Sequence, residues 1–360
     1  MVFESLLSEL RLENKFMVAQ VAPALRVSIG EEFGLPAGTI VTGKLVGALK
    51  QIGFQKVFDT STGADVVTVE EAHEFIERKE QGRLPLLTSC CPGFVSYVEH
   101  THPELVGNLC SVKSPHEVLG VLIKTYFAEK NDLKPEEICV VSIMPCVIKK
   151  AEALRHELSL NGVPHVDKVL TTVECAGLLK EAGVDLNSVK EEDFDELLGS
   201  SSGAGNIFGA TGGVLESVLR LYASIKDKDF GVMDFEPARG LEGVKVAEVS
   251  IGNEVLRVAV VNSLRNAASI LNDSDKLKSF HFIEVMACFG GCVGGAGQPS
   301  TTKEKIEARR KALYEIDLKK EKRVSSDNPA VKKLYEEFLI QPGSEKAKQL
   351  LYTTFHSAYE

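Results

Sequence analysis

The eight cysteines of this chain are unevenly placed, and their spacing is the feature best suited to chemistry. Cys90 and Cys91 are adjacent, Cys288 and Cys292 lie four residues apart, and Cys146 is followed closely by two lysines. Several thiolates gathered at one place bind a soft metal, either zinc or an iron–sulfur cluster. The fold must therefore bring these residues together.

Two features favour a cluster over zinc. Glycines surround Cys292, and glycine lets the backbone approach a large inorganic group and offer it N–H donors. Structural zinc sites more often contain paired CxxC sequences, and the chain has none. Spacing alone also allows these residues to be buried structural cysteines without a metal.

Each cysteine-bearing segment follows a short run rich in valine, isoleucine or leucine that predicts a strand. Loops at the carboxyl ends of parallel strands lie on one rim of a sheet, where α/β proteins build their sites. We therefore expect the five cysteines to converge. The segments are TSCCPGF at residues 88–94, MPCVIKK at residues 144–150 and EVMACFGGCVGGAGQP at residues 284–299.

Such runs alternate with amphipathic segments, which is typical of a parallel sheet with crossover helices. The predicted strands cover residues 17–21, 84–87, 138–143, 256–261 and 281–285. The predicted helices cover residues 43–52, 69–79, 172–182, 213–222 and 303–314. The predicted fold class is α/β, with two lobes that each contain a twisted, mainly parallel sheet flanked by helices.

The polar stretch at residues 190–205 is the clearest division in the chain. We expect a single domain over residues 1–360, with an N-terminal lobe over about 1–190 and a C-terminal lobe over about 205–325. A helical C-terminal segment is expected over about 326–360.

Composition excludes several classes of protein. The hydrophobic fraction of 44% excludes a disordered chain, and the net charge of −10 argues against a nucleic-acid partner. The longest apolar stretch, residues 138–148, is too short for a membrane span, and the N-terminus lacks the features of a secretion signal. We expect a cytoplasmic protein with reduced thiols and no membrane partner.

The three cysteine-bearing segments resemble the signature motifs of the iron-only ([FeFe]) hydrogenases, TSCCPxW, MPCxxKKxE and ExMACxxGCxxGGGQP. The resemblance extends over nearly the whole chain and implies one catalytic domain with a metal cluster between its lobes. Other segments that resemble the family, in the expected order, are VAPALR (21–26), GEEFG (30–34), TGK (42–44), VFD (57–59), KSP (113–115), GNIFGATGG (205–213) and RGL (239–241).

The resemblance implies a composite metal group, the H-cluster, that interconverts H2 with protons and electrons. Cys91, Cys146, Cys288 and Cys292 match the ligands of its 4Fe-4S cluster. Cys292 matches the ligand that also bridges to a diiron subcluster with CO, cyanide and azadithiolate ligands.

Lys149 matches a lysine that pairs with a cyanide ligand, as an ammonium group beside an anion would. Without the resemblance, a lysine after a strand is more often a solvated charge. Further residues that the resemblance assigns to the wall or surroundings of the diiron site are Ala22, Pro23, Ser114, Met144, Phe208, Gly209 and Met286.

Proton transfer to a buried cluster requires titratable groups within hydrogen-bonding reach of one another. Cys90 matches the thiol that exchanges protons with the bridgehead amine, and the family's relay continues through Glu71, Cys110, Glu74 and Arg78. The spacing of Glu71, Glu74 and Arg78 lets one helix face present all three. Composition alone would favour a solvated charged face.

The chain departs from the family pattern at four positions. Phe94 replaces a tryptophan, and Cys110 replaces a relay serine whose hydroxyl is the stronger hydrogen-bond donor. His116 stands where a glutamine is common, and Ala296 replaces the middle glycine of GGG. Cys110 and His116 bear on the rate of turnover, whereas the ligand set is complete.

No additional CxxCxxC run precedes the catalytic motifs, so the resemblance implies that an external carrier such as ferredoxin exchanges electrons with the cluster, unless the chain is an excised fragment. Loading of the diiron subcluster implies dedicated maturation proteins. Residues 303–323 contain nine Lys and Arg against five Asp and Glu, which suggests either a docking patch for an acidic carrier or an ordinary solvated helix.

Two other features are expected to carry no chemistry. Residues 203–209 superficially resemble a nucleotide-binding loop, but the third glycine is out of register and no strand precedes it. Cys139 and Cys175 are expected to be packed thiols.

Three functions compete at this level: a hydrogenase, a sensory homologue with slow turnover, and an iron–sulfur scaffold without a diiron site. An intact Lys149 and Glu71 argue against the scaffold, because a scaffold needs no proton relay. The altered Cys110 and His116 keep the sensory alternative open.

Overall fold

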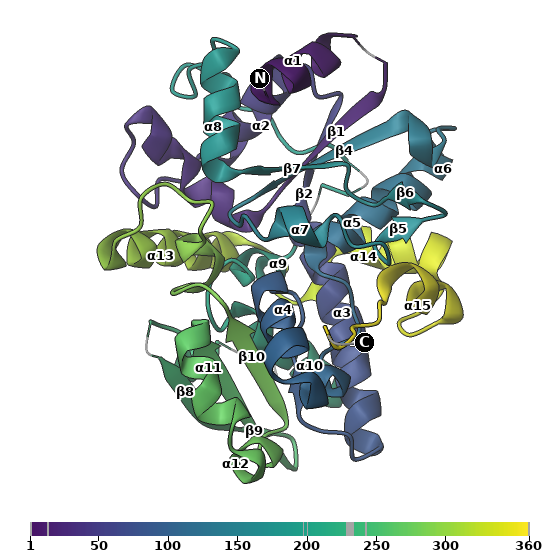
Figure 1. Cartoon of the computed structure of the whole chain (residues 1–360), viewed down its shortest axis with the longest axis vertical. Helices are drawn as coiled ribbons and strands as arrows, with labels where there is room; N and C mark the ends of the chain where they lie inside the picture. The colour runs from purple at the N-terminus through teal and green to yellow at the C-terminus, as the bar shows by residue number, and fades with distance from the viewer. Residues whose placement is uncertain are drawn as a thin grey trace.

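A computed structural model describes residues 2–12, 14–196, 198–199, 201–227, 234–241 and 243–358. Within these residues the chain forms two four-stranded sheets, one in each half of the molecule (Figure 1). The first has the order β2-β1-β4-β7 and is parallel, and the second has the order β3-β10-β9-β8, in which β8 is antiparallel. The strands are β1 (Phe16–Val21), β2 (Lys56–Asp59), β3 (Leu86–Leu87), β4 (Ile138–Met144), β7 (Lys168–Thr171), β8 (Val244–Ile251), β9 (Glu254–Asn262) and β10 (Phe282–Met286).

Helices cover both faces of the first sheet, because its central strands are apolar on both sides. Along β1, Met17 and Ala19 pack on one face and Val18 on the other, as the two-residue period of a strand requires. The helices on the first face are α1 (Val2–Leu12), α2 (Thr42–Gln51) and α8 (Thr172–Glu181). Those on the second are α3 (Thr60–Glu80) and α5 (Pro115–Leu122).

The second sheet is enclosed in the same way. Leu87 and Ile283 face one layer, and the preceding residues Leu86 and Phe282 face the other. The first layer consists of α4 (Pro92–Thr101), α11 (Leu264–Leu271) and α12 (Ser274–Lys278), and the second of α10 (Gly213–Lys226) and the C-terminal half of α3. Among the described helices, none has the length and apolar character that a bilayer crossing requires.

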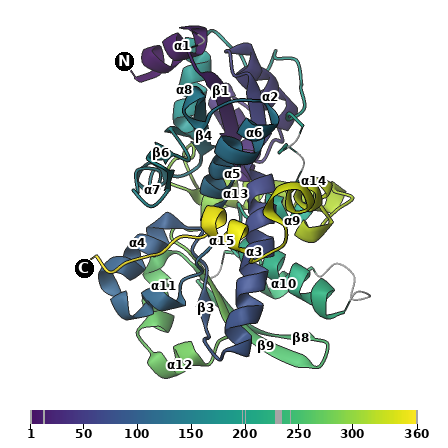
Figure 2. The same cartoon turned by 90° about the vertical axis from the view of Figure 1, so that its right-hand side faces the viewer.

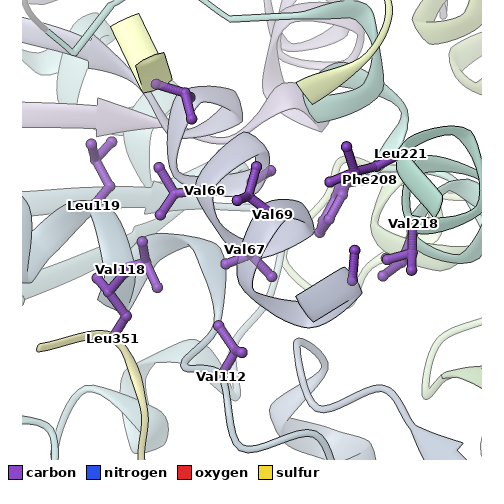
Figure 3. Close-up of a cluster of buried hydrophobic side chains, with 14 of the residues drawn as sticks. Val66, Val67, Val69, Val112, Val118, Leu119, Phe208, Val218, Leu221 and Leu351 are labelled. Carbon is purple, nitrogen blue, oxygen red and sulfur yellow. The ribbon is translucent and has the colours of Figure 1, made fainter. Parts of the chain in front are cut away.

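Helix α3 links the two halves, and Figure 2 shows it running from one sheet to the other. Its 21 residues extend over about 32 Å. One buried cluster, seen in Figure 3, joins Val66 and Val67 of α3 to Leu119 of α5 and Val218 of α10. The two sheets therefore share a hydrophobic core.

The start of α3 differs from the prediction of a helix over residues 69–79. The helix begins at Thr60, where the Asp59 side chain accepts a hydrogen bond from the Ser61 N–H and caps it. Its first turns contain threonine and glycine, which are poor helix formers, so tertiary packing stabilises them. At Gly63 a Cβ atom would lie 2.4 Å from the Pro115 carbonyl oxygen, so only glycine allows α3 and α5 this close.

The predicted lobe boundary at residue 190 is wrong in one respect. Strand β3, which precedes that boundary, pairs with β10 in the second sheet. The chain crosses to the second sheet along α3 and returns to the first at β4, so the lobes are not continuous segments. The predicted division at 190–205 includes residues 197 and 200, which lie outside the described residues. Helices α14 (Pro329–Leu334) and α15 (Glu345–Leu351) lie in the predicted C-terminal helical segment.

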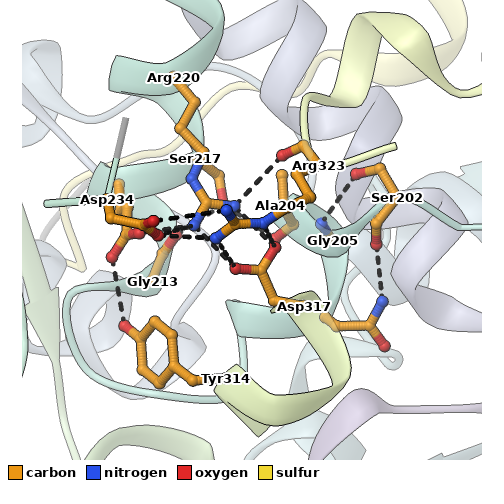
Figure 4. A network of polar contacts seen from close by, with 12 residues as sticks. Ser202, Ala204, Gly205, Gly213, Ser217, Arg220, Asp234, Tyr314, Asp317 and Arg323 are labelled. Atoms are coloured by element: carbon orange, nitrogen blue, oxygen red, sulfur yellow. Dashed lines mark hydrogen bonds and ion pairs between the residues drawn. The ribbon is translucent and has the colours of Figure 1, made fainter. Parts of the chain in front are cut away.

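A buried ionic network anchors α13 (Lys303–Lys319) to α10 (Figure 4). Asp317 accepts hydrogen bonds from Arg220 at 2.8 Å and from Arg323 at 2.6 Å, and Arg220 also bonds Glu216 at 2.7 Å. Several cations of the basic segment at residues 303–323 are therefore structural, including the buried Arg309, which pairs with Glu31.

Candidate active site

One buried cavity lies between the carboxyl ends of the two sheets, and Cys90, Cys91, Cys146, Cys288 and Cys292 all line it. Their convergence was expected, but the expectation that a single sheet rim provides it is wrong. Strand β4 of the first sheet leads to Cys146, whereas β3 and β10 of the second lead to the other four. The cavity leaves ≈ 80 Å³ for the centres of water-sized molecules.

Backbone N–H groups point at the cysteine sulfurs. Ala287 N–H donates to Cys91 Sγ at 3.4 Å, and Ala296 N–H donates to Cys288. Gly291 has a φ of 79°, and a Cβ there would lie 2.6 Å from the Thr211 backbone nitrogen, so this turn requires glycine. Burial raises the pKa of Cys91 to about 11, so metal binding would release its proton.

The spacing of these thiols distinguishes between the two metals that the sequence left open. Among the described residues, no three Cys, His, Asp or Glu side chains are close enough to hold one metal ion. Burial is the main cause that raises the pKa of Cys292, and the neighbouring Cys91, Cys146 and Cys288 raise it further. The four cysteines therefore lie near each other around the cavity. Thiolates spread around a space and supplied with N–H donors fit a multi-iron cluster better than a zinc ion, whose four ligands meet at one point.

Lys149 lies at the edge of the cavity and is held in place by polar contacts. Its Nζ donates to Glu152 Oε2 at 2.6 Å, to Ser114 Oγ at 2.8 Å and to the Cys90 carbonyl at 3.3 Å. Burial alone would lower the pKa of Lys149, but the Glu152 carboxylate outweighs it and the net shift is upward. The side chain is therefore a buried cation rather than a solvated charge.

The other wall residues expected from the sequence line the cavity, with one exception. Met144 and Met286 lie at the ends of β4 and β10, where soft apolar side chains exclude water. Ser114 contributes indirectly, by accepting a hydrogen bond from Lys149. The remaining wall residues from the prediction are Ala22, Pro23, Phe208 and Gly209.

A line of buried polar groups leads away from Cys90. The Cys90 pKa is raised by burial and then by Glu71, which places this carboxylate near the thiol. Cys110 lies within hydrogen-bonding reach of Glu71 and donates to Glu74 Oε2 at 3.3 Å, and Arg78 binds Glu74 at 2.6 Å. The two carboxylates and the guanidinium are buried, so the solvated-face alternative is wrong.

Glu71 combines two features of a proton carrier. Burial, and then the Glu74 carboxylate, raise its pKa to about 8, so its proton is exchangeable near neutral pH. Its Oε1 atom has no hydrogen-bond partner among the described residues. A buried acceptor of this kind is free to receive a proton or a water.

Sequence reasoning missed several polar residues around the site. Ser111 donates from its N–H and hydroxyl groups to Glu74, and Glu152 anchors Lys149. The three-residue step from Lys149 to Glu152 within the MPCxxKKxE motif was an available signal. Glu284, which accepts from the Gly212 and Leu215 N–H groups, is the first residue of the third motif, so its position in that motif was also an available signal.

Phe94 and Ala296 are two further residues that depart from the family motifs. Phe94 is fully buried beside α11 and the second sheet, so it fills its position as a packed aromatic. Ala296 is exposed. Cys139 and Cys175 are buried free cysteines, as expected.

The metal-free protein should become less stable between about pH 5 and pH 8. Burial raises the pKa of Asp65 to about 6, of Glu117 and Glu284 to about 7, and of Glu71 to about 8. The folded state thus keeps protons that the unfolded chain has lost above about pH 4, and this stabilisation disappears as the pH rises through the folded pKa values.

The expected decline is at most about 1.4 kcal/mol per pH unit for each such group. Groups with a lowered pKa act in the opposite direction. The contribution of Glu152, with a pKa of about 2, is complete below pH 5, whereas His165, with a pKa of about 3, offsets one of the four groups up to about pH 6.5. Urea denaturation followed by circular dichroism at several pH values measures the effect. A free energy of unfolding that stays constant or rises over this range would contradict the prediction.

Comparisons with known proteins agree with this geometry. A family model described as "Iron only hydrogenase large subunit, C-terminal domain" matches residues 15–296. The chain belongs to the iron-only hydrogenase family. A second model, "Iron hydrogenase small subunit", matches residues 303–358, so this hydrogenase-family chain carries segments similar to both subunits.

Curated relatives support the assignment. The NADP-reducing hydrogenase subunit HndD of Solidesulfovibrio fructosivorans is 43% identical over 95% of the chain, and iron hydrogenase 1 of Clostridium pasteurianum is 40% identical over 95%. The chain covers 60% and 61% of their respective lengths. A "Cytosolic Fe-S cluster assembly factor narfl" of Danio rerio is 32% identical over 96% of the chain and is covered over 87% of its own length.

Solved structures agree with the iron-only hydrogenase fold. A variant of the apo [FeFe]-hydrogenase HydA1 from Chlamydomonas reinhardtii superposes with a TM-score of 0.86 at 34% identity, with 98% of each chain covered. The two-lobed α/β prediction is thus confirmed at the level of the whole domain.

Proposed function

We propose that the chain is a hydrogenase that reversibly interconverts H2 with two protons and two electrons. Its cofactor would be an H-cluster, a 4Fe-4S cluster held by Cys91, Cys146, Cys288 and Cys292 and joined to a diiron subcluster with CO, cyanide and azadithiolate ligands. The observation that carries this proposal is the single cavity that these four cysteines share with Lys149.

The wall residues and Lys149 would prepare the site in different ways. When bound, the H-cluster supplies the metal chemistry that cleaves and forms H2. Met144, Met286 and Phe208 exclude water from the cavity, which strengthens electrostatic interactions inside it. Lys149 offers a buried ammonium group to an anionic cyanide ligand.

Cys90 would move the proton between the cavity and the buried line of Glu71, Cys110, Glu74 and Arg78. Glu71, Cys110 and Glu74 would pass the proton along this line. Arg78 stays charged and holds Glu74 by a hydrogen bond, and the Gly107 and Leu109 carbonyls fix Arg78 in turn. The thiol of Cys110 is the weakest donor of the series.

Replacing Cys110 with serine should therefore raise H2 turnover severalfold and lower its solvent isotope effect, because a hydroxyl donates more strongly to Glu71 and Glu74. Film electrochemistry in H2O and D2O measures both quantities. Cys139→Ser is the matched control, since this thiol is buried away from the cavity. An unchanged isotope effect, or slower turnover in Cys110→Ser than in the control, would contradict the assignment.

Electrons would be exchanged with an external carrier such as ferredoxin near α13. This helix packs against the Cys292 loop, since Ile306 lies beside Gly290 and Gly294, on either side of Cys292. Among the cations on α13, Lys303 and Lys311 are exposed and available to an acidic partner.

The double variant Lys303→Glu and Lys311→Glu should slow ferredoxin-linked turnover severalfold at low salt and leave methyl-viologen-linked turnover unchanged. The difference should shrink at high salt, because exposed charges are screened. The variant Lys332→Glu and Lys333→Glu on α14 carries the same change in net charge on another exposed surface. Equal rates of ferredoxin-linked turnover in the two double variants would contradict the proposed docking surface.

Infrared spectroscopy of the protein after exposure to maturation proteins tests the proposal. We expect bands of metal-bound CO and cyanide, and H2 production from reduced methyl viologen in the same sample. Absence of the bands after competent maturation would overturn the hydrogenase assignment, and a 4Fe-4S cluster alone would favour an assembly function. Bands without appreciable turnover would favour the sensory alternative. The single-domain organisation and cytoplasmic location stay predictions.

A further inference from the structure

A second group of buried ionisable residues lies behind Lys149, apart from the line that starts at Cys90. His116, at the start of α5, has its Nε2 2.9 Å from Glu152 Oε2, the same oxygen that accepts from Lys149. Glu117 Oε1 lies 3.2 Å from this Nε2. His116 Nδ1 is 3.0 Å from Ser142 Oγ. One imidazole edge therefore faces two carboxylates.

The arrangement leaves one carboxylate oxygen unsatisfied. His116, Glu117 and Glu152 are all buried, and Glu117 Oε1 accepts no hydrogen bond from the described residues. Lys149 pairs with Glu152, but two ionised carboxylates this close would repel each other in a medium of low dielectric constant. A proton on Glu117 relieves this repulsion.

The other charged groups around Glu117 do not remove the need for this proton. His165 Nδ1 lies 3.2 Å from Glu117 Oε2, but burial, followed by Lys113 and Lys124, lowers the pKa of His165 to about 3, so its ring is neutral. Lys113 donates to the Leu350 carbonyl at 2.7 Å, and burial lowers its pKa to about 8. Burial raises the pKa of Glu117 to about 7.

We propose that His116 and Glu117 are positioning residues for Lys149, and that Glu117 holds one exchangeable proton behind the Lys149–Glu152 ion pair. While this proton is present, His116 competes with Lys149 for Glu152 Oε2. Release of the proton increases the negative charge around Glu152 and draws the ammonium group of Lys149 toward it and away from the cavity. The role of Lys149 toward an anionic ligand in the cavity rests on the proposed function.

A small cavity lies beside Glu152, on the side away from His116 and Glu117, which do not line it. Lys113, Ser114 and Arg155 line it, and it leaves ≈ 10 Å³ for the centres of water-sized molecules, enough for about one water. Thr353 Oγ1 is a buried hydroxyl oxygen that lines this cavity and has no hydrogen-bond partner among the described residues. A water there would satisfy it and contact Glu152.

Nuclear magnetic resonance of the metal-free full chain tests the proposal. With ¹³C-carboxyl glutamate, we expect titration steps near neutral pH from Glu71, Glu117 and Glu284. The step that is lost in Glu117→Gln identifies Glu117, and this step should move to higher pH in His116→Gln, because the imidazole lowers the pKa of Glu117. With ¹⁵N-lysine, the Lys149 Nζ signal, identified by its loss in Lys149→Met, should shift over the same pH range in the wild type and stay constant in Glu117→Gln.

Glu129→Gln, on the exposed surface after α5, is the control and should leave both signals as in the wild type. The proposal would be overturned if no glutamate step near neutral pH were lost in Glu117→Gln, or if the Lys149 signal did not shift over the pH range of the lost step. If Glu117→Gln fails to fold, the test uses His116→Gln, which retains hydrogen-bonding groups toward Ser142 and Glu152. In this variant a glutamate titration step must move to higher pH for the proposal to stand. Since no metal is present, failure of H2 turnover leaves this result unaffected.

Discussion

Replacing Cys90 with alanine should lower H2 turnover by at least about 100-fold, because general acid–base groups contribute on that scale. The same variant should keep its 4Fe-4S cluster. Replacing the adjacent Cys91 with alanine should instead prevent stable binding of the 4Fe-4S cluster and abolish turnover altogether. Two neighbouring thiols on one cavity wall would thus have separate roles, one in proton transfer and one in metal binding.

The difference follows from where each sulfur is directed. Cys91 Sγ accepts an N–H hydrogen bond from Ala287, next to Cys288, whereas Cys90 interacts electrostatically with Glu71. Iron analysis, visible absorbance and electron paramagnetic resonance of the reduced protein measure the cluster, and a methyl-viologen assay measures turnover.

Cys175→Ala is the control, because this buried cysteine lies in the core on the far side of the first sheet. It should retain both iron and turnover after a modest loss of stability. Loss of the cluster in Cys90→Ala, or its retention in Cys91→Ala, would reverse the assignment of the two residues.

Replacing Glu71 with glutamine should also lower turnover by about 100-fold or more, with cluster loading unchanged. The amide cannot carry the proton that the carboxyl group, with its pKa of about 8, exchanges. The decline in stability between pH 5 and pH 8 should also become shallower in this variant, because one titrating group has been removed.

The adjacent Glu70 provides a matched control on the same helix. It is equally buried, but it accepts hydrogen bonds from Tyr335 at 2.5 Å, Tyr352 at 2.9 Å and the Gly343 N–H at 2.9 Å. Glu70→Gln should therefore weaken the attachment of the C-terminal segment to α3 and cost about 1–3 kcal/mol of stability, with turnover retained.

Urea denaturation and H2 assays on the two variants separate these effects. Equal losses of turnover in Glu70→Gln and Glu71→Gln, with clusters loaded in both, would indicate a structural cause and contradict the proton-transfer role of Glu71.

The sequence predicted the central strands better than the edge strands, for a physical reason. β1, β4, β9 and β10 are covered on both faces and read as apolar runs, so each was recognised from its pattern. β2, β7 and β8 lie at sheet edges, where polar residues interrupt the pattern, and these three were missed.

In the site as well, residues that belong to a local sequence pattern could be predicted, and contacts between distant segments could not. Cys91, Cys146 and Cys288 stand in local motifs that follow strands, so their convergence could be expected. The contact of His116 with Glu152, and that of His165 with Glu117, join residues far apart in the sequence. Nothing in the local pattern of either residue indicates such a partner, because tertiary packing alone creates it.

The pairing of β3 with β10 also sets the order of events during protein synthesis. Leu86 finds its partner only when Phe282 has been made, and the cysteines at 288 and 292 emerge later still. The walls of the cavity therefore cannot be completed before residues 282–292 have been synthesised. A metal cluster held between these walls must be inserted after translation has passed them.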